Sequence, residues 1–284
     1  MKPITLMAHL VANYPDPEGC LAAAEALAEA GTKYFEVQIP FSDPSADGKS
    51  IMTACSAALA AGFSVSDAFR LVDELKRRYP EIPVFVMAYA NLVASPGVET
   101  FVHKAGKAGV RALIVPDLPF DCDEGLAAAC AAYASSAHSA HNGTSAGSTE
   151  GPISAVPVAA PSMSRQRLMT MAALGRSYLY AALRTGITGQ ATEISESTKE
   201  FLSLCASGGS KVLGGFGIRS HAQALQVADH VHAVVAGSVF VDAIADAVEA
   251  HRVVRSGSFQ GSSRVRNEAI RSLVRERAQE IIGG

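Results

Sequence analysis

Short runs of β-forming residues alternate with alanine-rich helical segments along the whole of this chain. Eight apolar runs predict strands: Ile4–Val11, Tyr34–Ile39, Pro83–Ala88, Ala112–Val115, Ala155–Ala159, Tyr178–Ala181, Lys211–Gly214 and Ala233–Ala236. Segments between them, such as Glu18–Ala30 and Val65–Tyr79, have helical periodicity. Regular alternation of strand and helix predicts a parallel sheet, and eight units in 284 residues match a closed barrel. We therefore predict an α/β fold, a single (β/α)8 TIM barrel over residues 1–284. A doubly wound open sheet is the alternative, and the lack of Gly-x-Gly-x-x-Gly after the first strand disfavours it.

Composition excludes several classes of function. The net charge is -3 with no block of like charge, so we expect no nucleic-acid partner. No apolar run approaches the ~20 residues that span a bilayer, and the N-terminus has no cleavage site, so we expect a cytoplasmic protein without membrane contact. The eight histidines lack ligand spacing, and we expect no metal site. The cysteines have no Cys-x-x-Cys pair and predict reduced, buried thiols: Cys20, Cys55, Cys122, Cys130 and Cys205.

One segment interrupts the alternation. Residues Ala134–Pro152 are rich in Ser, Ala, Gly and His and have no apolar period. They predict an exposed, mobile, low-complexity loop insertion. Because it follows a helix and precedes a strand, it should lie on the face of the barrel opposite the active site.

The stretch Tyr34–Gly48 carries the densest set of chemically useful residues. Side chains alternate along a strand, so Glu36 and Gln38 should point into the barrel near its mouth. Desolvation of a carboxylate there suits it to proton transfer, although an interior basic partner for Glu36 is the structural alternative. Asp47 follows in the next loop, where it either ties a turn or acts as a second, partly solvated carboxylate.

Two glycine-rich turns lie where barrels of this kind bind phosphate. Gly214–Gly217 follows the seventh strand, and Ala236–Ser238 follows the eighth and opens a helix. Glycine lets backbone N–H groups approach phosphate oxygens, and a helix N-terminus favours a dianion. Ordinary turn chemistry is the alternative. Arg184–Gly189, after the sixth strand, suggests a hinged lid, with a merely long loop as its alternative.

Together these residues resemble the α subunit of tryptophan synthase over nearly the whole chain. The most specific stretch is Glu36–Gly48, which reads E-x-x-[IV]-P-F-S-D-P-x-A-D-G. Further motifs follow in family order: Tyr89–Val93, Asp117–Pro119, Tyr178-x-Tyr180, Arg184–Gly189, Gly215–Ile218 and Gly237–Ser238.

The resemblance implies retro-aldol cleavage of indole-3-glycerol phosphate to indole and D-glyceraldehyde 3-phosphate. It also implies a β-subunit partner in an α2β2 assembly, which holds pyridoxal phosphate and condenses the indole with L-serine. This chain itself would need no cofactor. By the same resemblance, Glu36 is the main acid/base and Asp47 assists at the indole nitrogen. The implied substrate-binding residues are Tyr180, Arg184, Thr188, Gly189, Phe216, Gly217, Gly237 and Ser238.

The chain departs from the family pattern at several points. The first strand begins almost at Met1, where the family usually has a helix, so we expect a less covered barrel floor. Gln38 replaces a usual glycine, and we expect it to hydrogen-bond Glu36, with space filling or contact with substrate as the alternative. Lys49 replaces a usual proline beside Asp47, and we expect it to lower the pKa of that carboxyl. Met87 and Pro116 also differ from common pocket residues.

Two other functions remain open from the sequence. One is a weakly active α-like barrel that acts mainly as a scaffold or activator of a β subunit. The other is a different phosphate-binding barrel, such as an isomerase of the same pathway, which the Pro40–Gly48 stretch disfavours.

Overall fold

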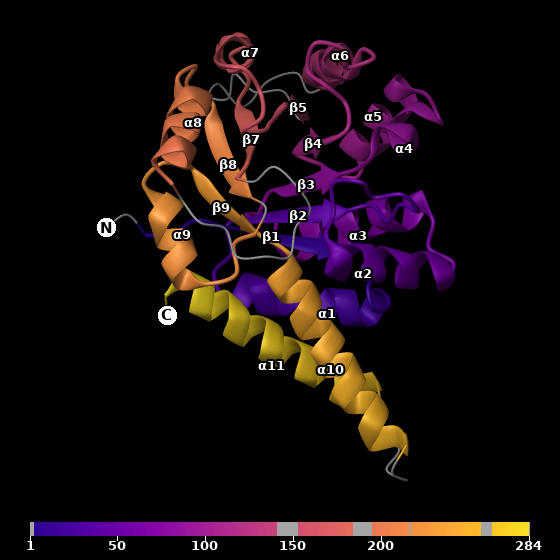
Figure 1. Ribbon diagram of the computed structural model, residues 1–284. Coiled ribbons are helices and arrows are strands. Elements are labelled where there is room, and N and C mark those ends of the chain that lie inside the picture. The colour runs from indigo at the N-terminus through magenta and orange to yellow at the C-terminus, as the bar shows by residue number, and fades with distance from the viewer. Residues whose placement is uncertain (1–2, 141–152, 184–194, 216, 257–262, 284) are drawn as a thin grey trace.

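The computed structural model describes residues 3–140, 153–183, 195–215, 217–256 and 263–283 (Figure 1). Its strands are β1 Leu6–Val11, β2 Tyr34–Gln38, β3 Val84–Met87, β4 Ala112–Ile114, β5 Ser154–Val156, β6 Val158–Ala159, β7 Tyr178–Ala182, β8 Lys211–Gly215 and β9 Ala233–Ala236. Every pairing among them is parallel, in the order β5-β4-β3-β2-β1-β9-β8-β7-β6. The predicted parallel α/β fold is confirmed.

The two ends of this sheet are parts of one strand. β5 pairs with β4 and β6 pairs with β7, and only Pro157 separates them. Proline has no N–H to donate, so the ladder changes partner there, while the Pro157 carbonyl accepts from the Tyr180 N–H at 2.9 Å. The predicted fifth strand, Ala155–Ala159, is therefore split, and the chain itself closes a barrel of eight strands.

Helices cover the outside of the barrel. They are α1 Pro17–Glu29, α2 Lys49–Ala60, α3 Val65–Arg78, α4 Ala90–Ala94, α5 Val98–Lys107, α6 Leu126–Ala140, α7 Arg165–Ala172, α8 Glu196–Ala206, α9 His221–Ala228, α10 Ser238–Ser256 and α11 Ser263–Ile282. Local chemistry sets their ends: Asp16 accepts from the Gly19 N–H at 2.9 Å, and Pro17 occupies the first turn of α1. None of the described helices is by itself long and apolar enough to cross a membrane, and α2 and α3 reach that composition only jointly, across a bend of 107°.

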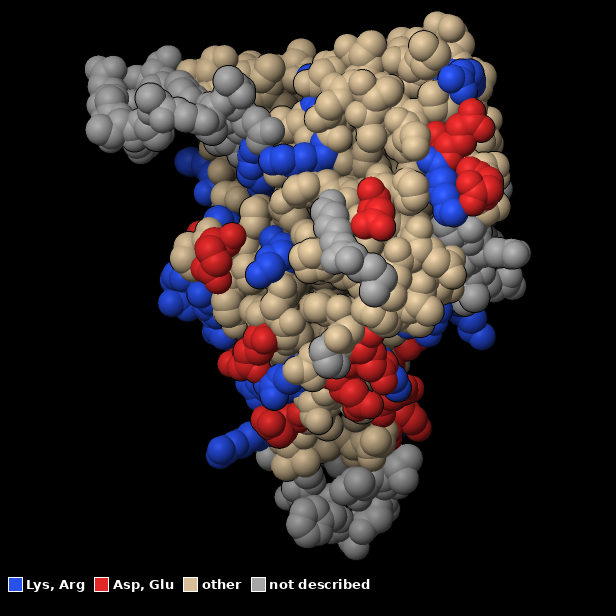
Figure 2. Space-filling view, turned by 90° about the vertical axis from the view of Figure 1, so that its left-hand side faces the viewer, with Lys and Arg blue, Asp and Glu red and all other residues tan. Residues whose placement is uncertain are grey.

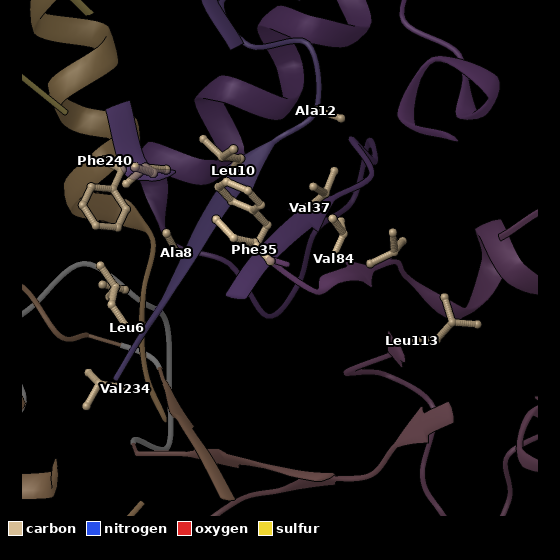
Figure 3. Packing of buried hydrophobic residues seen from close by; sticks show 14 of the residues in the cluster. Leu6, Ala8, Leu10, Ala12, Phe35, Val37, Val84, Leu113, Val234 and Phe240 are labelled. Carbon is tan, nitrogen blue, oxygen red and sulfur yellow. The ribbon is translucent and has the colours of Figure 1, made fainter. Parts of the chain in front are cut away.

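The core has an outer and an inner layer. Between strands and helices, Leu6 and Leu10 of β1 meet Phe35 of β2 and Phe240 of α10 (Figure 3). Inside the barrel, the floor is filled by aromatic rings, and Phe85 and Tyr178 meet edge to face with centroids 4.9 Å apart. The Lys211 ammonium and the Arg111 guanidinium lie over the Tyr178 ring, at 5.4 and 5.9 Å from its centroid. The floor that we expected to be less covered is thus packed from within.

Two predictions about surface segments are wrong in part. α6 continues to Ala140, so the first seven residues of the loop expected over Ala134–Pro152 are helical, because alanine favours the helix. Residues 141–152 lie outside the described residues. Four cysteines are buried as expected, but Cys122 is exposed in the turns before α6.

Candidate active site

A pocket of about 530 Å³ opens at the carboxyl ends of the barrel strands. It is lined by His9, Glu36, Asp47, Ile51, Met87, Ile114, Pro116, Val158, Tyr180, Gly217, Val235, Gly237 and Ser238. The structure therefore brings together six of the residues singled out from the sequence: Glu36, Asp47, Tyr180, Gly217, Gly237 and Ser238. Their side chains or backbones come from four different strand ends, as is usual for this fold.

Glu36 points into this pocket from β2, as predicted, and it has a basic partner. Glu36 Oε2 lies 3.1 Å from His9 Nδ1, and both side chains are almost fully buried. The two residues face each other across adjacent strands in the β1–β2 register. An interior basic partner, which the structural alternative required, is therefore present, and it is a histidine. Its presence does not decide between a structural and a catalytic role of Glu36.

Asp47 is held by two side chains on the opposite wall. Its Oδ2 accepts hydrogen bonds from Gln38 Nε2 at 2.7 Å and from Tyr89 Oη at 2.8 Å. Tyr89 Oη in turn accepts from the Ala46 N–H at 3.0 Å, and its ring stacks on Phe41. Asp47 is thus fixed in one orientation at the pocket wall.

Three expectations about these carboxylates are wrong. Gln38 hydrogen-bonds Asp47 instead of Glu36. Glu36 and Gln38 are two residues apart on one strand, which separates them by ~6.6 Å, whereas Gln38 lies at the end of β2 and can reach the following loop. Asp47 is buried instead of partly solvated. Burial is also the main reason why the pKa of Asp47 is raised, and the exposed Lys49 at the start of α2 does not lower it.

The turn after β9 brings a helix N-terminus to the pocket. The Gly237 carbonyl accepts a hydrogen bond from the Phe240 N–H at 2.9 Å, so Gly237 caps α10. The first N–H groups of a helix have no partners within that helix, and Gly237 and Ser238 at this helix end line the pocket. Glycine fits closely at this position, because a Cβ there would lie 3.0 Å from that of His9, which would then have to shift. Gly217 has φ of +104°, which also favours glycine.

A guanidinium adjoins the same helix end. Arg219 Nη1 donates to Ser238 Oγ at 2.9 Å, and its Nη2 donates to Asp242 Oδ2 at 2.6 Å. Arg219 is half-buried between the turn after β8 and α10. A fixed cation beside a helix N-terminus strengthens the attraction for an anion.

Tyr180 forms the pocket wall on β7. Burial, with the nearby charges of Glu36 and Asp47, raises the pKa of its phenol well above the ordinary value, so the phenol stays neutral. Four other residues that the resemblance implied lie outside the described residues: Arg184, Thr188, Gly189 and Phe216.

Sequence reasoning assigned no role to three polar residues at this site: His9, Tyr89, which was named only as the start of a motif, and Arg219. His9 is a single polar residue in the apolar run Leu6–Val11, a signal that marks a buried functional group. Tyr89 and Arg219 each sit one or two residues past a strand or a glycine turn, and nothing local reveals their partners. Within the described part of the chain, no three His, Cys, Asp or Glu side chains come together in a way that could hold a metal ion.

Comparisons with known proteins agree with this geometry. A family model described as the tryptophan synthase alpha chain matches residues 2–267. The tryptophan synthase alpha chain of Helicobacter hepaticus is 36% identical over 247 residues, which are 85% of this chain and 86% of that one. The Methanosarcina acetivorans alpha chain is 32% identical over 279 residues, covering 98% and 89%.

Solved structures give the same result. A chain of the tryptophan synthase complex from Pyrococcus furiosus superposes with a TM-score of 0.78 at 26% identity, covering 100% of this chain and 99% of that one. A chain of tryptophan synthase from Mycobacterium tuberculosis does so with a TM-score of 0.75 at 29% identity, covering 99% and 94%.

Proposed function

The chain belongs to the tryptophan synthase alpha chain family, and from this premise we propose how its pocket performs the reaction. It is a lyase of tryptophan biosynthesis that cleaves indole-3-glycerol phosphate to indole and D-glyceraldehyde 3-phosphate. It works with a tryptophan synthase β subunit, to which the indole passes. One observation carries the proposal for the site: two buried carboxylates, Glu36 and Asp47, face one pocket that also contains the N-terminus of α10.

Glu36 is the acid/base in this proposal. Cleavage requires a proton to be added at C3 of the indole and a proton to be removed from the hydroxyl of the adjacent glycerol carbon. As the C–C bond breaks, its electrons return to the indole ring and the hydroxyl carbon becomes the aldehyde. A single carboxyl beside this bond can donate the first proton and accept the second, and the enzyme ends in its starting protonation state.

Asp47 accepts a hydrogen bond from the N–H of the indole, whose nitrogen becomes positively charged once C3 is protonated. A carboxylate fixed by Gln38 and Tyr89 stabilises this charge without first having to reorient. Met87, Ile114 and Pro116 provide the apolar wall beside the ring. The neutral phenol of Tyr180 completes that wall on β7.

The phosphate binds at the other end of the pocket. We assign its binding to the N–H groups of Gly217, Gly237 and Ser238, which line the pocket, and the guanidinium of Arg219 adds a charge next to Ser238. In the same proposal, Arg184, Thr188, Gly189 and Phe216 complete the substrate site.

The chain acts in the cytoplasm as one barrel domain of an α2β2 assembly. Pyridoxal phosphate belongs to the β partner, and this chain uses no cofactor of its own. A role purely as a scaffold for the β subunit is not favoured, because a scaffold has no need for two desolvated carboxylates that face one pocket.

The variant Glu36→Gln tests the assignment. We expect kcat for indole release to fall about 10²–10⁴-fold, because the amide cannot exchange protons. Affinity for glycerol 3-phosphate, measured by calorimetry, should stay within about twofold, since the phosphate end is untouched. Turnover like that of the unmodified protein would contradict the role of Glu36. Loss of phosphate affinity would instead indicate a misfolded pocket.

A further inference from the structure

Among the described residues, His9 is the one whose side chain hydrogen-bonds the carboxylate of Glu36. The side chains of His9 and Glu36 are 7% and 4% exposed, so water competes little with the contact between Nδ1 and Oε2. The second ring nitrogen, Nε2, is also buried and has no hydrogen-bond partner among the described residues. A buried histidine with one nitrogen on a carboxylate is unusual in a strand that is otherwise apolar.

The neighbours of His9 hold its ring in place. A Cβ on Gly237 would lie within 3.2 Å of His9 Cβ, Cγ and Cδ2, so the backbone of the phosphate turn packs directly on the ring. On the β2 side, Glu36 faces the ring at its own register position. The imidazole is therefore clamped between the predicted acid/base and the predicted phosphate turn.

The charges around His9 favour its protonated form. The titratable groups facing it are Glu36 on β2, Asp47 in the following loop and Tyr180 on β7, while the β9 strand, Ala233–Ala236, has none. Burial alone lowers the pKa of His9, but the hydrogen bond and charge of Glu36, with the charge of Asp47, outweigh burial and raise it above 6.5. His9 therefore brings its proton against the carboxyl of Glu36 through their hydrogen bond.

We propose that His9 is a positioning residue that orients the carboxyl of Glu36 and stores the proton which Glu36 delivers to the indole. The inference rests on the proposed function of Glu36. His9 Nδ1 passes its proton to Glu36, and Glu36 protonates C3 of the indole. Glu36 next accepts the proton of the glycerol hydroxyl as the C–C bond breaks, and that proton returns to Nδ1. No proton is gained or lost by the pair over one turnover.

This role has a consequence for the pH profile. When the pair loses its shared proton at alkaline pH, no acid remains for C3 and kcat/KM falls. An imidazole keeps its proton to higher pH than an isolated carboxyl does. Removing the imidazole should therefore move the alkaline limb of the profile toward acid pH.

The experiment compares His9→Gln and His9→Phe with the unmodified protein, with and without a β subunit. Glutamine can still donate a hydrogen bond to Glu36 but cannot titrate, whereas phenylalanine can do neither. We expect the alkaline limb of kcat/KM to move by about one pH unit or more in both variants. We also expect kcat at its optimum to fall about tenfold further in His9→Phe, which loses the orientation as well.

His103→Gln is the matched control, because His103 is exposed on α5. It should leave the profile unchanged. A second measurement does not depend on activity: the NMR titration of the His9 ring should lie above the ordinary histidine range and should move down in Glu36→Gln.

Two results would overturn the inference. One is a uniform loss of kcat with an unmoved alkaline limb, which indicates a packing role. The other is a His9 titration that Glu36→Gln does not change. If the unmodified protein released no indole at all, the proposed function would fail, and the NMR titration would still decide whether His9 and Glu36 share a proton.

Discussion

At the proposed phosphate end of the pocket, a single residue supplies a charge that the glycine turns cannot. Arg219 bridges Ser238 on the first turn of α10 and Asp242 one turn later. Because Asp242 also binds the guanidinium, the side chain is held beside Ser238 instead of extending into solvent. It is thus prepared to meet the second charge of a phosphate dianion.

Arg219→Gln should weaken substrate binding while preserving the chemical step. We expect KM to rise about tenfold, the loss of one partly screened charge-assisted contact, with kcat almost unchanged. Calorimetry with glycerol 3-phosphate should show the same loss of affinity, larger at low salt than at high salt. Arg70→Gln, on the exposed face of α3, is the control and should bind normally. Equal affinity in both variants would place the phosphate away from Arg219.

At the scale of elements, the C-terminal helix α11 packs against α1, the first helix of the chain. It also packs beside α10. α10 and α11 extend together toward the bottom of Figure 1. Its buried side chains recur every three or four residues at Ile270, Val274, Ala278 and Ile281, which is the spacing of one helix face. The opposing face of α1 is mostly alanine, and a Cβ on Gly19 would come within 3.3 Å of Ile270 Cδ1, so the two helices lie close.

Ion pairs flank this helix contact without deciding its strength. Arg266, Arg271 and Arg275 pair with Asp16, Glu25 and Glu29 of the N-terminal region. Most of these side chains are a third or more exposed, and such pairs stabilise a fold by less than about 1 kcal/mol each. The apolar stripe is therefore expected to dominate the free energy of the contact.

Ile270→Ala tests that ranking. The free energy of unfolding, from urea titration, should fall by about 2–4 kcal/mol, because the substitution leaves a cavity between α1 and α11. Arg271→Gln should cost less than about 1 kcal/mol. Indole release per folded molecule should be normal in both variants, since α11 contributes no residue to the pocket. A greater loss in Arg271→Gln would reverse the ranking.

At the scale of the whole molecule, most charged side chains lie dispersed at the surface, and among the described residues the buried acidic and basic side chains are His9, Glu36 and Asp47. On the face shown in Figure 2, acidic and basic side chains are interspersed among uncharged areas, in keeping with 18% charged residues. Folding raises the pKa of several groups that are buried in the barrel, among them His9, Asp47 and Tyr180. The pH dependence of stability should therefore reflect the interior.

The free energy of unfolding should fall as pH rises through neutrality. The pKa of His9 is raised above its ordinary 6.5, so its contribution is complete below that pH and disappears as pH passes the folded-state pKa. Asp47, whose pKa is raised from 3.8, adds a loss of the same sign at lower pH. The fall in Tm between about pH 6 and about pH 9 should be smaller in His9→Gln than in the unmodified protein or in His103→Gln. Parallel Tm curves in all three proteins would show that His9 is not charged in the folded state.

Local pattern alone determined much of this protein. The alternation of apolar strands and alanine-rich helices predicted the barrel, and the period of two along Tyr34–Ile39 placed Glu36 and Gln38 on the inner face. Glycines after the last two strands predicted where a helix N-terminus would meet the pocket. These features can be predicted from the sequence, because each depends on residues only a few positions apart in the chain.

The partners of the buried polar groups were decided only by tertiary structure. Glu36 meets His9, which is 27 residues away along the chain, because neighbouring strands lie ~4.8 Å apart, closer than residues two apart on one strand. Tyr89 likewise reaches Asp47 from beyond the end of the neighbouring strand β3, 42 residues along the chain. Gln38 meets Asp47 more locally, because the loop after β2 brings it to the end of that strand. Arg219 finds Ser238 only when the turns after β8 and β9 close side by side. Sequence spacing carries no record of such contacts, since barrel closure and register, set by the packing of the whole chain, bring them together.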